Sequence, residues 1–104
     1  MDFEIKKIEE ADYRLIVYTS DDASTGYVCV LRDLTDLHAQ AVDALDNVPV
    51  TPSGMFALLL SSVSKDKPYR LISYASEHSD GFRMTRVDIN MLKVALEAFF
   101  NGNS

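Results

Sequence analysis

In the first third of the chain, apolar residues either alternate with polar ones or occur in short runs, as they do in β-strands. Residues 13–19 and 27–32 carry β-branched and aromatic side chains on both faces, which is typical of central strands. Residues 2–10 alternate less regularly, because the apolar positions slip by one after Ile5, as in a strand with a β-bulge. The links between these segments are too short for helical crossovers, so we predict an antiparallel meander in which 13–19 and 27–32 are neighbours.

Two later segments show the spacing of helices. Residues 33–46 place one stripe on a single helix face: Leu34, Leu37, His38, Ala41 and Leu45. Residues 89–100 follow Asp88, a good N-cap, and precede an Asn-Gly stop signal. Their stronger stripe is Ile89, Leu92, Leu96, Phe99 and Phe100, and their weaker stripe is Met91, Val94, Ala95 and Ala98. We expect both segments to be helices that bury their stronger stripes.

Residues 47–64 contain no charged side chain and fit two kinds of element. Thr51 and Pro52 suit the start of a helix, and helical spacing gathers the apolar residues on about 200° of the wheel. Gly54 in the first turn weakens such a helix by about 1 kcal/mol relative to alanine. The alternative is a buried strand over 55–60, since short apolar runs fit both periods. We predict the helix.

The remaining strands complete a predicted α+β fold. Residues 69–75 and 82–87 are expected to form a hairpin whose loop ends in an Asp-Gly pair. The element order is then β-β-β-α-α-β-β-α. We therefore predict a single domain over residues 1–104, with a mostly antiparallel five-stranded sheet and helices packed on one face.

Charge changes this picture more than composition does. The 104 residues carry a formal net charge of −6 at pH 7, and residues 1–47 hold eleven acidic and four basic side chains. Nucleic acid is a disfavoured partner, because its binding depends on neutralising phosphates with lysine and arginine. In element order and acidity the chain resembles the small acidic chaperones of type III secretion, although those begin with a helix. The resemblance implies a dimer of acidic α+β protomers.

Nothing in the sequence predicts a membrane segment or secretion. The apolar run over 55–60 is much shorter than the about 20 residues that a spanning helix needs. No basic segment followed by an apolar one opens the chain, so we expect a cytoplasmic protein. The single Cys29 lies between two valines and is expected to be a small core residue.

Few residues suggest catalysis or metal binding. His38 is a candidate general base, but a partly buried, hydrogen-bonded histidine is the better interpretation. Residues 77–80 read Glu-His-Ser-Asp, whereas catalytic triads are assembled in space and not by adjacency. The adjacent Asp21 and Asp22 lack the spaced third oxygen ligand of a calcium loop. We predict no catalytic residue, metal or cofactor; the alternative is a small enzyme with a site around His38 or His78.

The best candidate site is an acidic face on the helix over 33–46. Asp36, Asp43 and Asp46 lie within about 80° of arc at 100° per residue, with Gln40 beside them. An ordinary solvated face is the alternative interpretation. We predict a non-enzymatic protein-binding module, such as an inhibitor, an immunity protein or a chaperone, that docks a basic protein partner on this face.

Surplus apolar surface on two predicted helices also predicts a homodimer. The residues expected at its interface are Met55, Leu58, Met91, Val94 and Ala98. A structural homo-oligomeric subunit is therefore the alternative function.

Overall fold

The computed structural model describes residues 3–20, 23–51, 54–60, 69–73 and 83–102. The first antiparallel sheet has the order β1-β2-β3, formed by β1 (Phe3–Lys7), β2 (Asp12–Ser20) and β3 (Ala23–Val30). The second has the order β4-β5-β6, formed by β4 (Phe56–Leu60), β5 (Tyr69–Ser73) and β6 (Arg83–Val87). The helices are α1 (Leu31–Leu45) and α2 (Ile89–Gly102).

The predicted single five-stranded sheet is wrong. The described residues form two three-stranded antiparallel sheets, and the element order is β-β-β-α-β-β-β-α. The order differs from the prediction at one place, because residues 56–60 form strand β4 and not part of a helix. The resemblance to type III secretion chaperones depended on the predicted order and loses that basis.

Contacts from α1 make residues 56–60 a strand. Gly54 has φ of 73°, in the left-handed region, which a regular right-handed helix cannot contain. On α1, the side-chain amide of Gln40 donates to the Phe56 carbonyl (2.9 Å) and accepts from the Leu58 N–H (3.0 Å). Gln40 thus bonds to β4 as a neighbouring strand would, and the strand alternative for this segment is the one that the structure shows.

The predicted meander is confirmed in the first sheet. β2 pairs with β3 in antiparallel fashion, with Leu15 opposite Tyr27, and β1 pairs with β2, with Ile5 opposite Leu15. The register of β1 is regular, so the bulge expected there is absent; a register shift occurs instead in β2, after Tyr18.

Local caps set the ends of the helices. α1 begins two residues before the predicted start, and the Asp33 carboxylate in its first turn accepts the Val30 N–H at 3.1 Å. Its C-cap is Asp46, and the residue after the cap, Asn47, has a φ of 59° in the left-handed region, a common conformation after a helix. The predicted cap of α2 is confirmed, because Asp88 Oδ1 accepts the Met91 N–H at 3.1 Å.

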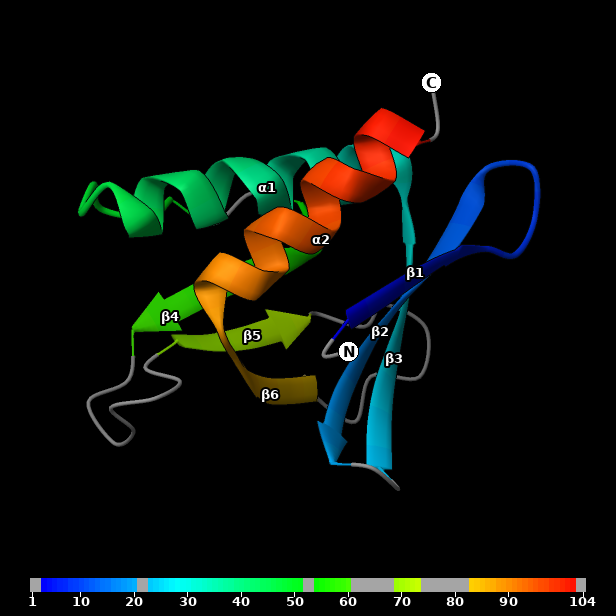
Figure 1. Cartoon of the computed structure of the whole chain (residues 1–104), viewed down its shortest axis with the longest axis horizontal. Helices are drawn as coiled ribbons and strands as arrows, with labels where there is room; N and C mark the ends of the chain where they lie inside the picture. Colours follow the sequence, from blue (N-terminus) through cyan, green and yellow to red (C-terminus); the bar gives the residue numbers. More distant parts are fainter. Residues whose placement is uncertain (1–2, 21–22, 52–53, 61–68, 74–82, 103–104) are drawn as a thin grey trace.

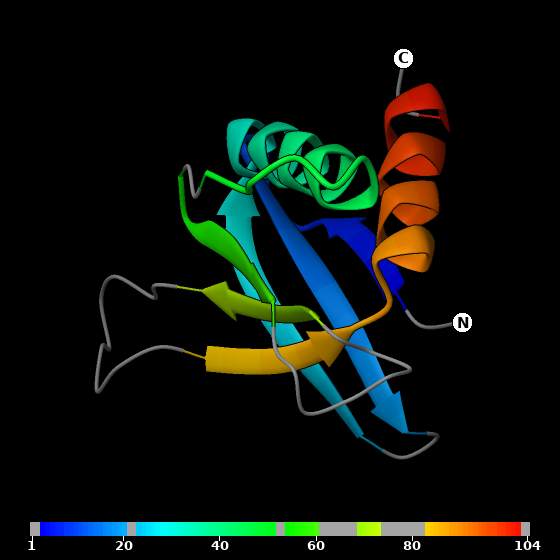
Figure 2. The same ribbon diagram turned by 90° about the vertical axis from the view of Figure 1, so that its left-hand side faces the viewer.

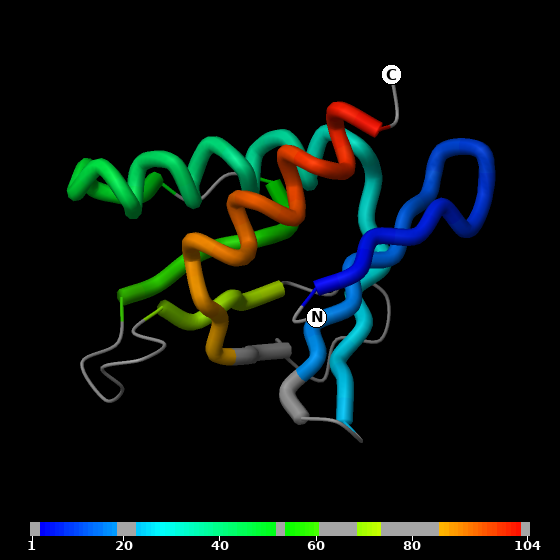
Figure 3. The backbone as a smooth tube through the Cα atoms, viewed as in Figure 1, coloured from blue at the N-terminus to red at the C-terminus, as the bar shows by residue number. Residues whose placement is uncertain are grey.

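The helices and both sheets share one core. In both ribbon views α1 lies across the top of the two sheets, and α2 lies beside β1 (Figures 1 and 2). Tyr27 of the first sheet meets Phe56 of the second, with ring centroids 5.8 Å apart. Tyr13 meets Phe99 of α2 at 5.4 Å. Figure 3 shows the consequence for the chain: its first strand and its last helix, β1 and α2, lie side by side.

Candidate functional site

The acidic face is less exposed than the helical wheel suggests. An Asp36 carboxylate oxygen lies 3.1 Å from where a Cβ on Gly54 would sit, so this side chain packs against the turn before β4. Asp43 is half-buried and Asp46 is exposed. Arg32 precedes Asp36 by four residues, a spacing that allows pairing on a helix. Docking of a basic protein on this face stays a prediction.

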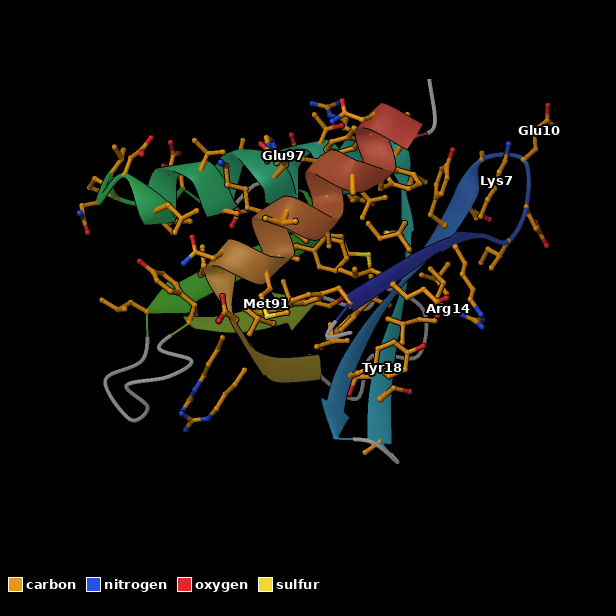
Figure 4. All side chains as sticks on the ribbon, in the orientation of Figure 1. Lys7, Glu10, Arg14, Tyr18, Met91 and Glu97 are labelled. Atoms are coloured by element: carbon orange, nitrogen blue, oxygen red, sulfur yellow. The ribbon has the colours of Figure 1, made fainter. Side chains whose placement is uncertain are left out.

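His38 joins the two helices. Its Nε2 lies 3.1 Å from Oε2 of Glu97, and its ring centroid is 5.7 Å from that of Phe100. The hydrogen bond with His38, together with the charge of nearby Lys93, lowers the pKa of the Glu97 carboxyl. Figure 4 shows Glu97 on the side of α2 next to α1. The prediction of a partly buried, hydrogen-bonded histidine is confirmed.

The remaining candidates for catalysis or metal binding are Cys29, residues 77–80 and residues 21–22. Burial, and secondarily the charge of Asp33, raise the pKa of the Cys29 thiol to about 12, so the thiol stays neutral in the core as predicted. Residues 77–80, with His78, and residues 21–22 lie outside the described residues. Among those described, no group of three or more histidine, cysteine, aspartate or glutamate side chains is arranged to hold a metal ion.

A groove runs between α2 and β1, with a cavity volume of about 610 Å³. Its lining comes from the first strand and the last helix: Phe3, Glu4, Ile5, Asn90, Met91, Val94, Ala95, Ala98 and Phe99. Glu4 is the one ionisable residue in this lining, so within the described part of the chain the groove is predominantly apolar.

The structure divides the residues predicted at the dimer interface. Leu58 is only 1% exposed and has almost no surface for a second chain, whereas Met55 is half-buried and packs against the core, so its part in an interface stays a prediction. Met91 and Val94 are 44% and 64% exposed, and both line the groove together with Ala98. Figure 4 shows Met91 near the start of α2. The weaker stripe of α2 is therefore one wall of the groove.

The other wall is an open strand edge. The Ile8 N–H donates to the Asp12 carbonyl at 3.0 Å, so the N–H of Ile8 points towards the second arm of the hairpin. Because inward and outward backbone groups alternate along antiparallel strands, the N–H and C=O groups of Phe3, Ile5 and Lys7 point away from β2. No described residue bonds to this edge, whereas Gln40 closes the outer edge of β4.

Sequence reasoning missed this edge, although one signal was available. The first strand of a three-stranded meander has a neighbour on one side only. The spacing of apolar residues in the sequence does not show that α2 lies beside that strand.

Comparison of the chain with protein-family models, with curated proteins and with solved structures finds no match. In addition, neither helix within the described residues is long and apolar enough to span a membrane.

Proposed function

We propose that this protein is a non-enzymatic protein-binding module that receives an extended segment in the groove between β1 and α2. One observation carries the proposal: a strand edge to which no described residue bonds borders an apolar groove. Proteins that bind peptides by strand addition use this combination, in which main-chain hydrogen bonds supply affinity and side-chain pockets supply specificity.

The geometry also defines the chemistry of the segment. Side chains of an added strand would alternate between the two faces of the first sheet. Those on the inner face would meet Met91, Val94 and Ala98, so they should be apolar. Those on the outer face would lie beside Glu4 and Lys6, near water, so they should be polar. The expected ligand is a strand with apolar residues at alternate positions.

Catalysis has less support than binding. His38 contacts Glu97 and does not line the groove, and the Cys29 thiol is buried and neutral. The acidic face of α1 lies on a different element from the groove. It can attract a basic partner over distance without forming the binding site itself.

The proposal is tested with peptides selected from a displayed library of eight-residue sequences. We expect the selected peptides to carry alternating apolar residues and to shift the NMR signals of the Phe3, Ile5 and Lys7 amides. Val94→Asp should weaken their binding at least about tenfold, which corresponds to about 1.4 kcal/mol, because a carboxylate would then face the apolar groove.

Val28→Asp is the matched control. Val28 is also an exposed valine, but it lies on β3 and not in the groove, so this variant should bind the peptides as the wild type does. Unchanged binding by Val94→Asp, or peptide-induced shifts confined to other amides, would show that the groove is not the site.

A further inference from the structure

We infer that the segment received at this site is β1 of a second copy of the chain. The inference rests on the proposed function, because it names the partner for the same strand edge. Two β1 strands paired edge to edge would join the first sheets of both copies into one antiparallel sheet of six strands. The contact would be isologous, as in most homodimers.

Hydrogen bonding limits the register of this pairing. The backbone N–H and C=O groups of Phe3, Ile5 and Lys7 point away from β2 in both copies. Residues of this set must therefore lie opposite one another across the new contact. A two-fold axis at Ile5 meets this condition and pairs all five residues of β1. Axes at Glu4 or at Lys6 also meet the condition, but they pair only part of the strand.

Charge selects the same register. With the axis at Ile5, Glu4 of each copy faces Lys6 of the other, and this opposite-charge pair occurs twice. With the axis at Glu4 two glutamates face each other, and with the axis at Lys6 two lysines do. Opposite charges directly across neighbouring strands stabilise a sheet, whereas like charges destabilise it. The sequence Glu4-Ile5-Lys6 is thus self-complementary in the one full-length register.

Both side chains are in place for these pairs. Glu4 and Lys6 lie on the outer face of the first sheet, where their charged groups are 3.6 Å apart within one chain. The Tyr18 hydroxyl donates to the Glu4 carboxylate at 2.7 Å and restricts its position. Figure 4 shows Tyr18 on β2, the strand that pairs with β1.

The second copy would also cover the groove. A two-fold axis perpendicular to the joined sheet keeps both α2 helices on the same face, one on each side of the axis. The stripe of Met91, Val94 and Ala98 on each helix then faces the other copy. This accounts for large apolar side chains that are exposed in the single chain.

The test exchanges the two charges and measures association by sedimentation velocity. Glu4→Lys alone places two lysines opposite each other in both cross-strand pairs, and Lys6→Glu alone places two glutamates there. Each single variant should therefore raise the dimer dissociation constant at least about tenfold. An equimolar mixture of the two variants should form a heterodimer, because both cross-strand pairs are then of opposite charge. The double variant Glu4→Lys/Lys6→Glu should dimerise as the wild type does.

Glu10→Lys is the control for the change in net charge. Glu10 is exposed beyond the end of β1, so its replacement should leave the dissociation constant within about twofold of the wild type. Thermal melts of each variant check that it folds, and the mixture separates loss of the pair from loss of the fold.

Three results would overturn the inference. Lysines on an edge strand also serve to prevent pairing, and a wild-type chain that stays at 11.6 kDa up to high micromolar concentration would assign that role to Lys6 and Lys7. A dimer insensitive to both single exchanges would overturn it as well, as would a mixture that fails to associate.

The two proposals can fail separately. If the dimer is absent while displayed peptides still shift the NMR signals of the Phe3, Ile5 and Lys7 amides, the proposed function stands and only the second copy as partner is wrong. If both the dimer and the peptide-induced shifts are absent, both proposals fail.

Discussion

At the scale of single residues, Gln40 has more influence on the fold than its type suggests. The helical wheel places it beside the acidic residues of α1, yet it is only 2% exposed and its amide makes two hydrogen bonds to the backbone of β4. Asp36 and Asp43 lie one turn away on either side, which explains why both are half-buried. The buried amide of Gln40 therefore closes one edge of the second sheet. Its burial also brings the neighbouring Asp36 and Asp43 of the acidic face close to the rest of the protein.

Gln40→Met tests this role at nearly constant side-chain volume. The substitution leaves the Phe56 carbonyl and the Leu58 N–H without a partner, so we expect the free energy of unfolding in urea to fall by about 2–4 kcal/mol. Ala39→Met, at the exposed neighbouring position, should change it by less than about 0.5 kcal/mol. Equal stability of Gln40→Met and the wild type would mean that packing alone holds β4 against α1.

At the scale of elements, α2 presents two apolar stripes to different surroundings. Leu92 and Leu96 are fully buried in the shared core, whereas Met91 and Val94 line the open groove. His38 and Glu97 connect the helix to α1 on a third side. The helix is thus fixed by the core and by α1, which leaves its weaker stripe available beside β1.

Substitutions on the two stripes should separate their roles. Leu96→Ala removes a fully buried side chain and should lower the free energy of unfolding by about 2–5 kcal/mol. Val94→Ala, on the exposed stripe, should lower the stability of the single chain by less than about 1 kcal/mol. Denaturant melts at concentrations where the chain is monomeric measure both, and a loss below about 1 kcal/mol for Leu96→Ala would contradict the assigned core face.

At the scale of the whole molecule, the acidic face of α1 and the apolar groove lie on different elements. The excess of acidic residues belongs to the first 47 residues, which form the first sheet and α1. The groove lies between α2 and β1, a strand of that first sheet, and Glu4 is its only ionisable lining residue among those described. A partner could therefore be attracted by the overall field and held by the groove, and these two effects can be measured separately.

The triple variant Asp36→Asn/Asp43→Asn/Asp46→Asn measures the first effect. Removing three negative charges should slow the association of a basic displayed peptide several-fold at low salt, with little change in its dissociation rate, because steering acts on encounter. Added salt should shrink the difference. Stopped-flow binding with a melt of each protein checks this, and an unchanged association rate at low salt would leave the acidic face as an ordinary solvated surface.

The sequence alone determined the features that depend on local periodicity. The meander of the first three strands, the two helices with their stripes, and the Asp88 cap all follow from side-chain spacing within a few residues. The same holds for the buried Cys29, whose neighbours are apolar on both sides. The sequence also predicted the second apolar stripe of α2, because the apolar surface of this helix is wider than a single contact with the core requires.

Only the tertiary structure decided the features that depend on residues far apart. The apolar run of β4 fits either period, and the choice of strand comes from Gln40 on another element. The division into two sheets is a matter of non-local pairing, which no periodicity contains. The groove exists because the last helix packs beside the first strand, so a stripe from residues 91–98 and an edge from residues 3–7 form one surface.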